Sequence, residues 1–269
     1  MHPLTRAAAV LSFACLTARA DEPPAWQTLL TPAVFGPQPK LAPCRLDYRV
    51  SWKGLLDAGS VRFDFGNPEN ARPGAYVVTS ASESLGAAAA LYTYKHWFWS
   101  ELDPASLWPK RFHSVEDVSG KRVLHTIDYH PANVHCSQTT RVLKNGFEYT
   151  RERDFAFAPV HDVFSAMLFV RSQDLADGTR LGLLVQPGEN PYLVRIHVIG
   201  HEPHDDRPAI RMNVTMLKID PTSGRLLPYK KLKSATLWLS DDADRVPLEI
   251  RADVFIGDVR VDLVRMTKF

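Results

Sequence analysis

The sequence predicts a mainly β fold, a curved antiparallel sheet or partly closed β-barrel with one packed α-helix at about residues 161–172. Apolar side chains recur at every second position in several segments, and short turn signals separate these segments. A single longer stretch instead shows the spacing of an amphipathic helix. The mature part of the chain is therefore expected to be one β-rich domain over residues 45–269.

Residues 1–20 have the layout of a secretory signal peptide. Arg6 precedes a mostly apolar run over residues 7–18, and Ala18-Arg19-Ala20 has the small residues of a cleavage site. Twelve helical residues span about 18 Å, less than a bilayer core of about 30 Å. The sequence thus predicts export to the periplasm, with no transmembrane segment in the mature protein. Lipidation at Cys15 is not expected, because the usual leucine three residues before it is missing.

Residues 21–44 are predicted to form a proline-rich extended arm, which Leu29, Leu30, Val34 and Phe35 would anchor to the domain. Proline fixes φ and lacks an N–H donor, so a proline-rich segment does not form regular helices or inner strands. The prolines lie at positions 23, 24, 32, 37, 39 and 43.

The strand pattern begins at residue 45. Residues 45–53 alternate strictly between apolar and polar side chains, and the two-residue period recurs in residues 123–129, 210–216, 248–256 and 259–263. Asn145-Gly146 is a strong hairpin signal because both residue types tolerate positive φ. Further turn signals lie at residues 119–120, 177–178, 187–188, 223–224 and 257–258. Short connections of this kind join antiparallel strands.

Two segments are predicted to be helical. Val163, Phe164, Met167 and Leu168 lie on one helical face, which would pack against the sheet. A shorter helical piece is expected at residues 84–91, which include a run of alanines.

The charge balance argues against nucleic-acid binding. Residues 1–20 hold two of the 32 basic residues and none of the 30 acidic ones, which leaves 30 of each in the mature chain. A phosphate-binding surface needs clustered lysines and arginines. Cys44 and Cys136 would remain after cleavage, either as a disulfide in an oxidising compartment or as two unpaired, half-buried cysteines.

Residues 197–206 hold the richest polar cluster. His197, His201 and His204 are metal-ligand types, and a metal site would need three or four such groups to converge. The alternative is that a strand ends at about Ile199 and that HEPHDDRP is its solvated turn. The sequence favours the turn, so neither a metal nor another cofactor is predicted.

His161, Asp162 and Ser165 together raise the question of nucleophilic catalysis. No Gly-x-Ser-x-Gly elbow or glycine run that could form an oxyanion hole surrounds Ser165. We expect Asp162 instead to cap the helix N-terminus, whose free N–H groups favour an acidic side chain. No catalytic residue is predicted.

Residues 92–99 are rich in aromatic side chains. Alternation places Trp97 and Trp99 on one face, with His96 and Phe98 on the other. One set would belong to the core, and the second could line an apolar groove or stack on sugars.

Four stretches resemble the bacterial family known as domain of unknown function 3108. They are YRVSWKGLLDAGSVRF (48–63), DVFSAMLFVRSQDLADG (162–178), VIGHE (198–202) and WLSDDADRVPLEI (238–250). The resemblance covers roughly residues 45–265 and implies a secreted envelope protein with no established activity. The segment HEPHDDRPAI is the most individual part of this chain. A curved sheet with a helical plug is also similar, as a fold, to periplasmic lipoprotein carriers, but fold does not fix function.

The sequence therefore favours a non-catalytic periplasmic protein that binds a lipid, an acyl chain or an envelope polysaccharide in a sheet groove. The alternative is a structural or assembly protein that docks an envelope partner through a sheet edge or the N-terminal arm. A third hypothesis is a hydrolase or metal enzyme that uses the histidines of residues 197–206.

Overall fold

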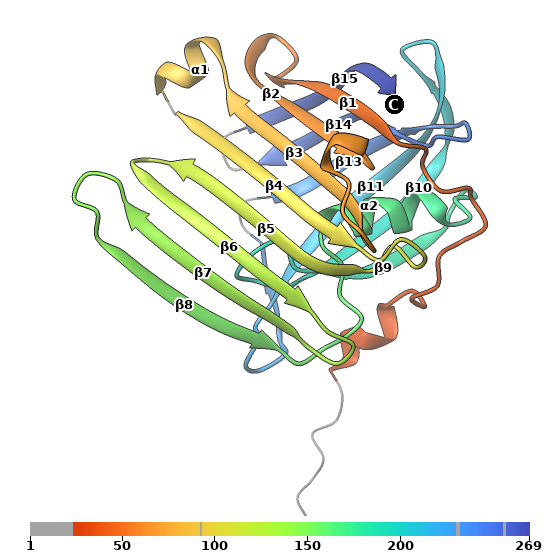
Figure 1. The fold of residues 1–269 in the computed structure, drawn as a ribbon. Coiled ribbons are helices and arrows are strands. Elements are labelled where there is room, and N and C mark those ends of the chain that lie inside the picture. The colour runs from red at the N-terminus through yellow and green to blue at the C-terminus, as the bar shows by residue number, and fades with distance from the viewer. Residues whose placement is uncertain (1–23, 92, 230–231, 255–256) are drawn as a thin grey trace, which may run out of the picture.

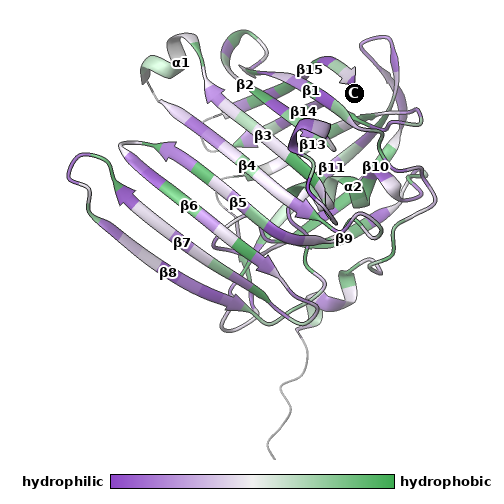
Figure 2. Cartoon of the chain, viewed as in Figure 1, coloured by the Kyte–Doolittle hydropathy of each residue, from purple (hydrophilic) through white to green (hydrophobic). Residues whose placement is uncertain are grey.

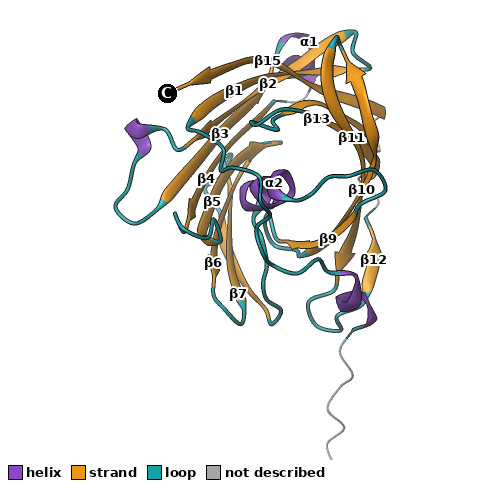
Figure 3. Ribbon diagram, turned by 90° about the vertical axis from the view of Figure 1, so that its right-hand side faces the viewer, coloured by secondary structure: helices purple, strands orange, loops and turns teal. Residues whose placement is uncertain are grey.

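The computed structural model describes residues 24–91, 93–229, 232–254 and 257–269. The predicted signal peptide and Cys15 lie outside the described residues. The structure is one antiparallel sheet of 15 strands that curls without closing (Figures 1 and 3). The predicted mainly β fold is therefore confirmed.

The strand order is β8-β7-β6-β5-β4-β3-β2-β1-β15-β14-β13-β11-β10-β9, and the short β12 pairs with β11. Most neighbours are sequential hairpins, and the pairing of β1 with β15 joins the two ends of the chain. The strands are β1 (Cys44–Trp52), β2 (Leu56–Phe65), β3 (Tyr76–Ser84), β4 (Tyr94–Leu102), β5 (Pro109–Val118), β6 (Lys121–Tyr129), β7 (Val134–Val142), β8 (Glu148–Phe155), β9 (Arg180–Val185), β10 (Tyr192–His204), β11 (Arg207–Ile219), β12 (Leu226–Pro228), β13 (Leu232–Ser240), β14 (Pro247–Val254) and β15 (Gly257–Lys268).

Most tight turns follow the sequence signals, with two corrections. The predicted turn at residues 257–258 was wrong, because both residues lie in β15, where Gly257 pairs with Val254 and Asp258 with Asp253. Ser119 and Gly120 both have positive φ and connect β5 to β6 as a two-residue hairpin. The prediction that the strand ends at about Ile199 was wrong, because β10 continues to His204 and only Asp205 and Asp206 form the turn. A bulge between Val198 and Gly200 interrupts the alternation, and this is why the pattern alone suggested an end there.

Helix α2 (Val163–Ser172) fills one end of the curl (Figure 3), close to the predicted bounds. Asp162 is its N-cap and forms a capping box with Ser165, as expected. Its largely hydrophobic ribbon (Figure 2) reflects a buried position. Phe164 lies 6.0–6.3 Å, ring to ring, from four phenylalanines on the concave side of the sheet: Phe63, Phe65, Phe98 and Phe112.

The second predicted helix is α1 (Gly86–Leu91), a single short piece between β3 and β4. Two 3₁₀ segments, η1 (Ala25–Leu29) and η2 (Pro68–Asn70), complete the helical elements of the described residues. None of the helices there is a candidate membrane span; α2, the longest, has 10 residues, about half of the 20 that a bilayer requires.

The segment before β1 lies against the edge strand β9 and the C-terminal end of α2. Trp26 is its main anchor, buried to 5% exposure with its indole N–H donating to the carbonyl of Gly224 at 2.7 Å. Leu30 and Phe35 also pack against the core, whereas Leu29 and Val34 are exposed. The proposed anchoring by Leu29 and Val34 was therefore wrong, because these side chains stay 47% and 70% exposed.

Arg171 joins this segment, α2 and the β13–β14 loop. Its side chain is almost fully buried and donates to the backbone carbonyls of Pro39, Ala243 and Asp244 at 2.7–3.0 Å. Arg245 of the loop donates in return to the carbonyls of Arg171 and Gln173. Two of the four stretches that resemble the family, 162–178 and 238–250, thus meet in one hydrogen-bond network.

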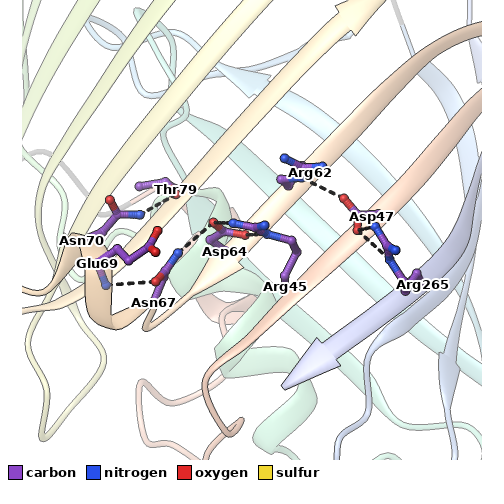
Figure 4. Close-up of polar contacts among 9 residues, drawn as sticks. All are labelled: Arg45, Asp47, Arg62, Asp64, Asn67, Glu69, Asn70, Thr79 and Arg265. Carbon is purple, nitrogen blue, oxygen red and sulfur yellow. Dashed lines mark hydrogen bonds and ion pairs between the residues drawn. The ribbon is translucent and has the colours of Figure 1, made fainter. Parts of the chain in front are cut away.

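The convex surface of β15, β1 and β2 carries ion pairs rather than an apolar patch (Figure 4). Asp47 lies between Arg62 and Arg265, at 2.8 and 3.2 Å. Arg45 donates two hydrogen bonds of 2.7 Å to Asp64, which lowers the pKa of that carboxyl. The convex side of this part of the sheet therefore faces solvent, and the apolar side faces the helix.

Candidate functional site

The concave side of the sheet is the surface on which a ligand site can be built. Its residues are identified by register, because they alternate with the outer residues and share a side with Phe63, Phe98 and Phe112, which contact α2. We call this surface the inner face. Helix α2 covers one end of it (Figure 3), and the strands extend beyond the helix (Figure 1).

Beyond α2, the inner face of β1, β2, β11, β14 and β15 is apolar. The side chains there are partly exposed rather than buried, although each lies in a strand flanked by two others. Partly exposed apolar side chains on a concave surface are typical of ligand sites. They include Val50, Val61, Val214, Met216, Ile250 and Val261.

Beyond the phenylalanines that contact α2, the inner face of β4–β7 carries polar side chains by contrast. His96, Ser114, His125 and Gln138 lie on adjacent strands, and the loop of residues 186–190 packs against His125 and Cys136. We call these four residues and this loop the inner polar patch. The loop is held by Tyr129, which donates to the carbonyl of Gln186 at 2.7 Å, and by Arg153, which pairs with Glu189 at 2.7 Å.

Both histidines of this patch are held neutral. Burial lowers the pKa of His96 to about 4 and also lowers the pKa of His125. The hydroxyl of Tyr94 lies 2.6 Å from Nδ1 of His96, and the hydroxyl of Ser114 lies 3.2 Å from Nδ1 of His125. The patch therefore offers hydrogen bonds rather than positive charge at neutral pH.

The structure divides the aromatic strand as the alternation predicted. His96 and Phe98 face inward, where Phe98 packs on α2 and His96 lies beyond it. Trp97 and Trp99 face outward. Trp99 is sandwiched between Arg72, at 3.7 Å, and the ring of His113, at 5.3 Å.

Trp97 is 42% exposed at the rim of a shallow outer depression of about 280 Å³. Of the four predicted candidates, His96 alone therefore lies on the uncovered part of the inner face. A binding role for any of the four stays a prediction.

The histidines of residues 197–206 have separate partners. His201 contacts Asp177 at 2.8 Å, while His204 stacks on Trp238 and pairs with Glu249 at 2.7 Å. His197 lies farther along β10. Within the described part of the chain, no three His, Cys, Asp or Glu side chains gather as a metal-binding group would.

His161, Asp162 and Ser165 are buried at the base of α2. Asp162 accepts hydrogen bonds from the backbone N–H groups of Phe164 and Ser165 and from the hydroxyl of Ser100. Burial lowers the pKa of His161 to about 3, and its ring stacks on Trp108 at 4.3 Å. These contacts are those of a helix cap inside a packed core.

Cys44 and Cys136 are both free and buried. They belong to β1 and β7, and strands β2–β6 lie between them in the sheet order. Of the two alternatives, the structure therefore shows unpaired cysteines rather than a Cys44–Cys136 disulfide. Burial raises the pKa of Cys44 to about 11 and of Cys136 to about 12, so neither thiol is activated.

Several residues of the inner polar patch were not found from the sequence. Gln138 lies in a strand without strong alternation, and Gln186, Glu189 and Asn190 lie in a loop whose only signal was the Pro187-Gly188 turn. The loop lies against β6 and β7 only because the sheet curls, and the pattern within single strands does not specify this.

Comparison with known proteins agrees with this fold. The model of the family "Protein of unknown function (DUF3108)" matches residues 47–264. Among curated proteins, none matches the sequence.

A solved structure, the β-barrel-like protein of domain of unknown function DUF1849 from Brucella abortus, is similar with a TM-score of 0.53 and 12% identity, over 86% of this chain and 99% of that chain. Two weaker matches each cover 87% of this chain and 99% of theirs. One, from Bacteroides fragilis, is named as an exported protein with a YmcC-like fold (TM-score 0.34, 6% identity). The other, from Parabacteroides distasonis, is named as a lipoprotein (TM-score 0.30, 7% identity).

Proposed function

The chain belongs to the DUF3108 family of proteins of unknown function, and we propose that it is a non-catalytic protein of the periplasm that holds a lipid or other acyl-chain ligand on its inner face. The proposed location rests on the predicted signal peptide. The proposed absence of catalysis rests on the roles of His161, Asp162 and Ser165 in the helix cap.

The proposal of an acyl-chain ligand rests on one observation. The inner face of β1, β2, β11, β14 and β15 is apolar and partly exposed, whereas a sheet that only enclosed a core would bury these positions. Val50, Val61, Ile250 and Val261 lie on neighbouring strands and form one continuous surface. Binding an acyl chain would remove this surface from water, at about 25 cal/mol per Å² of apolar area.

Native mass spectrometry of protein purified from the periplasm tests this function. We expect the protein to carry a lipid-sized adduct, because an acyl chain on the inner face dissociates slowly. Ile250→Glu, which places a charge on the inner face, should lose the adduct. Leu124→Glu, a matched change on the outer face of β6, should keep it. Bare protein in both the parent and Leu124→Glu would contradict the proposal, provided that circular dichroism shows folded protein.

A second candidate, docking of a partner, is favoured by the edge of β15. This strand pairs with β14 only through Gly257–Asp262, although it pairs with β1 as far as Lys268. A cavity of about 430 Å³ lies beside the uncovered edge, with Leu248 and Leu263 among its lining residues. An extended segment of an envelope protein could add there as a strand.

The other sheet edges are less suited to docking. The edge strand β8 is largely hydrophilic (Figure 2), and charged side chains discourage the addition of a strand from another protein. The edge of β9 is bonded to Thr31 and His161. A photocrosslinker at position 264 should therefore capture a specific envelope protein if docking is the function, while one at position 124 should not. No capture at position 264 would reject this candidate.

A further inference from the structure

The inner polar patch contains buried hydrogen-bonding atoms that no described residue satisfies. They are Nε2 of His96, Oε1 of Gln138, Oε1 of Gln186 and Oδ1 of Asn190. Gln186 is only 1% exposed. Buried polar groups in folded proteins almost always have a partner, so four such atoms in one region require an explanation.

These atoms lie close together in the fold. Gln138 is opposite His125 across the β6–β7 pair, and the ring of His125 faces Gly188 of the loop that carries Gln186 and Asn190. His96 is the next inner residue after Phe98 on β4, and Phe98 pairs with Ser114, which pairs in turn with His125. The four atoms therefore border one part of the inner face.

The unsatisfied groups share a chemical preference. Three of the four are carboxamide oxygens, which only accept hydrogen bonds, so they require donors. Two arginines of β8 lie next to the patch: Arg153 is already paired with Glu189 at 2.7 Å, and Arg151, opposite Gln138, stacks on the ring of Tyr149 at 5.2 Å. The patch thus suits an uncharged group with several O–H donors.

We propose that the inner polar patch binds the uncharged, hydroxyl-bearing headgroup of an amphiphile whose chain lies on the apolar inner face. This inference rests on the proposed function and adds to it the chemistry of the headgroup. The arrangement places the polar β4–β7 half and the apolar half on one curved sheet, as an amphiphile requires. The patch itself contains no lysine or arginine, and Glu189 of its loop is acidic, which disfavours an anionic headgroup there.

Calorimetric titration of the mature protein with two lipids that share one chain tests the proposal. The probes are 1-monopalmitoylglycerol, which has two hydroxyls, and palmitate, which has a carboxylate. We expect the glycerol ester to bind at least about tenfold more tightly, a difference that two or three hydrogen bonds supply. Gln138→Leu should weaken binding of the ester about fivefold, the effect of one hydrogen bond, and leave palmitate unchanged.

Two further variants keep the test decisive. Thr139→Val, on the outer face of the same strand, should change neither affinity. Asn190→Ala removes a carboxamide of the same patch from the loop and should also weaken binding of the ester about fivefold. It replaces Gln138→Leu in the test if Gln138→Leu does not fold. Equal or tighter binding of palmitate, or equal effects on both lipids, would overturn the headgroup inference and leave the proposed function standing. Binding of neither lipid would overturn both.

Discussion

At the scale of single residues, the most consequential side chain is Arg171. A buried guanidinium is costly unless its N–H groups are bonded, and here they bond to three carbonyls from two separate segments. The sequence placed Arg171 at the end of the helix but could not reveal its partners, because they lie about 70 and 130 residues away.

Replacing Arg171 tests this network. Arg171→Met keeps much of the volume but leaves the carbonyls of Pro39, Ala243 and Asp244 without their donor, so we expect a loss of about 2–4 kcal/mol in the free energy of unfolding. Arg180→Met, at an exposed position of β9, should change it by less than about 0.5 kcal/mol. Urea denaturation measures both, and similar values for the two variants would contradict the role of Arg171.

Buried histidines predict how stability depends on pH. The folded-state pKa values of His161 and His96 are lowered to about 3 and about 4, whereas an unfolded histidine titrates near 6.5. Below about pH 6.5 the unfolded chain takes up these protons and the folded chain does not, so stability falls as the pH falls.

His161→Phe should therefore reduce the slope of unfolding free energy between pH 4.5 and 6 by up to about 1.4 kcal/mol per pH unit. His135→Gln serves as the control. Asp154 raises the pKa of His135, which confines its contribution to pH values above about 6.5 and leaves the acid slope unchanged. Parallel slopes for His161→Phe and the parent protein would show that His161 is not buried as described.

At the scale of elements, the strands could be predicted and their exact limits could not. Strict alternation placed β1 within one residue of its bounds, and helical spacing located α2. The bulge in β10 concealed the last residues of that strand, because one extra residue reverses the side on which side chains point. In β4, alternation placed His96 and Trp97 on opposite sides of the sheet. It could not show which side faces the helix, because alternation alone does not identify the inner side.

Two substitutions in the β10–β11 turn are expected to change the free energy of unfolding in opposite directions. Asp205 and Asp206 both have positive φ, which glycine adopts without strain and β-branched residues strongly disfavour. Asp206→Gly should raise the free energy of unfolding by about 0.5–1 kcal/mol, and Asp206→Val should lower it. Thermal melts of both variants provide the check, and a less stable glycine variant would be inconsistent with this turn.

The segment before β1 depends on close backbone approach at two glycines. A Cβ on Gly182 would lie 2.0 Å from the carbonyl oxygen of Leu29, and one on Gly36 would lie 2.2 Å from that of Ser172. Gly182→Ala should therefore displace the segment and speed tryptic cleavage after Lys40. Gly200→Ala, whose nearest neighbour is 3.7 Å away, should be cleaved at the parental rate. Equal rates for the two variants would mean that the segment does not lie against β9.

At the scale of the whole molecule, the central feature is one sheet with two kinds of inner surface. Helix α2 fills one end, and the remaining inner face is polar on β4–β7 and apolar on β1, β2, β11, β14 and β15. The sequence predicted a groove but not this division, since the division arises from which strands become neighbours when the sheet curls.

Photocrosslinking with a diazirine-labelled palmitoyl lipid, followed by mass spectrometric mapping, tests the account most directly. It predicts that labelled peptides come from β1, β11, β14 and β15, at inner positions such as Val50, Val214, Ile250 and Val261. Labelling confined to outer positions such as Leu124 and Trp97, or the absence of saturable labelling, would contradict the assignment of the inner face as the ligand-binding surface.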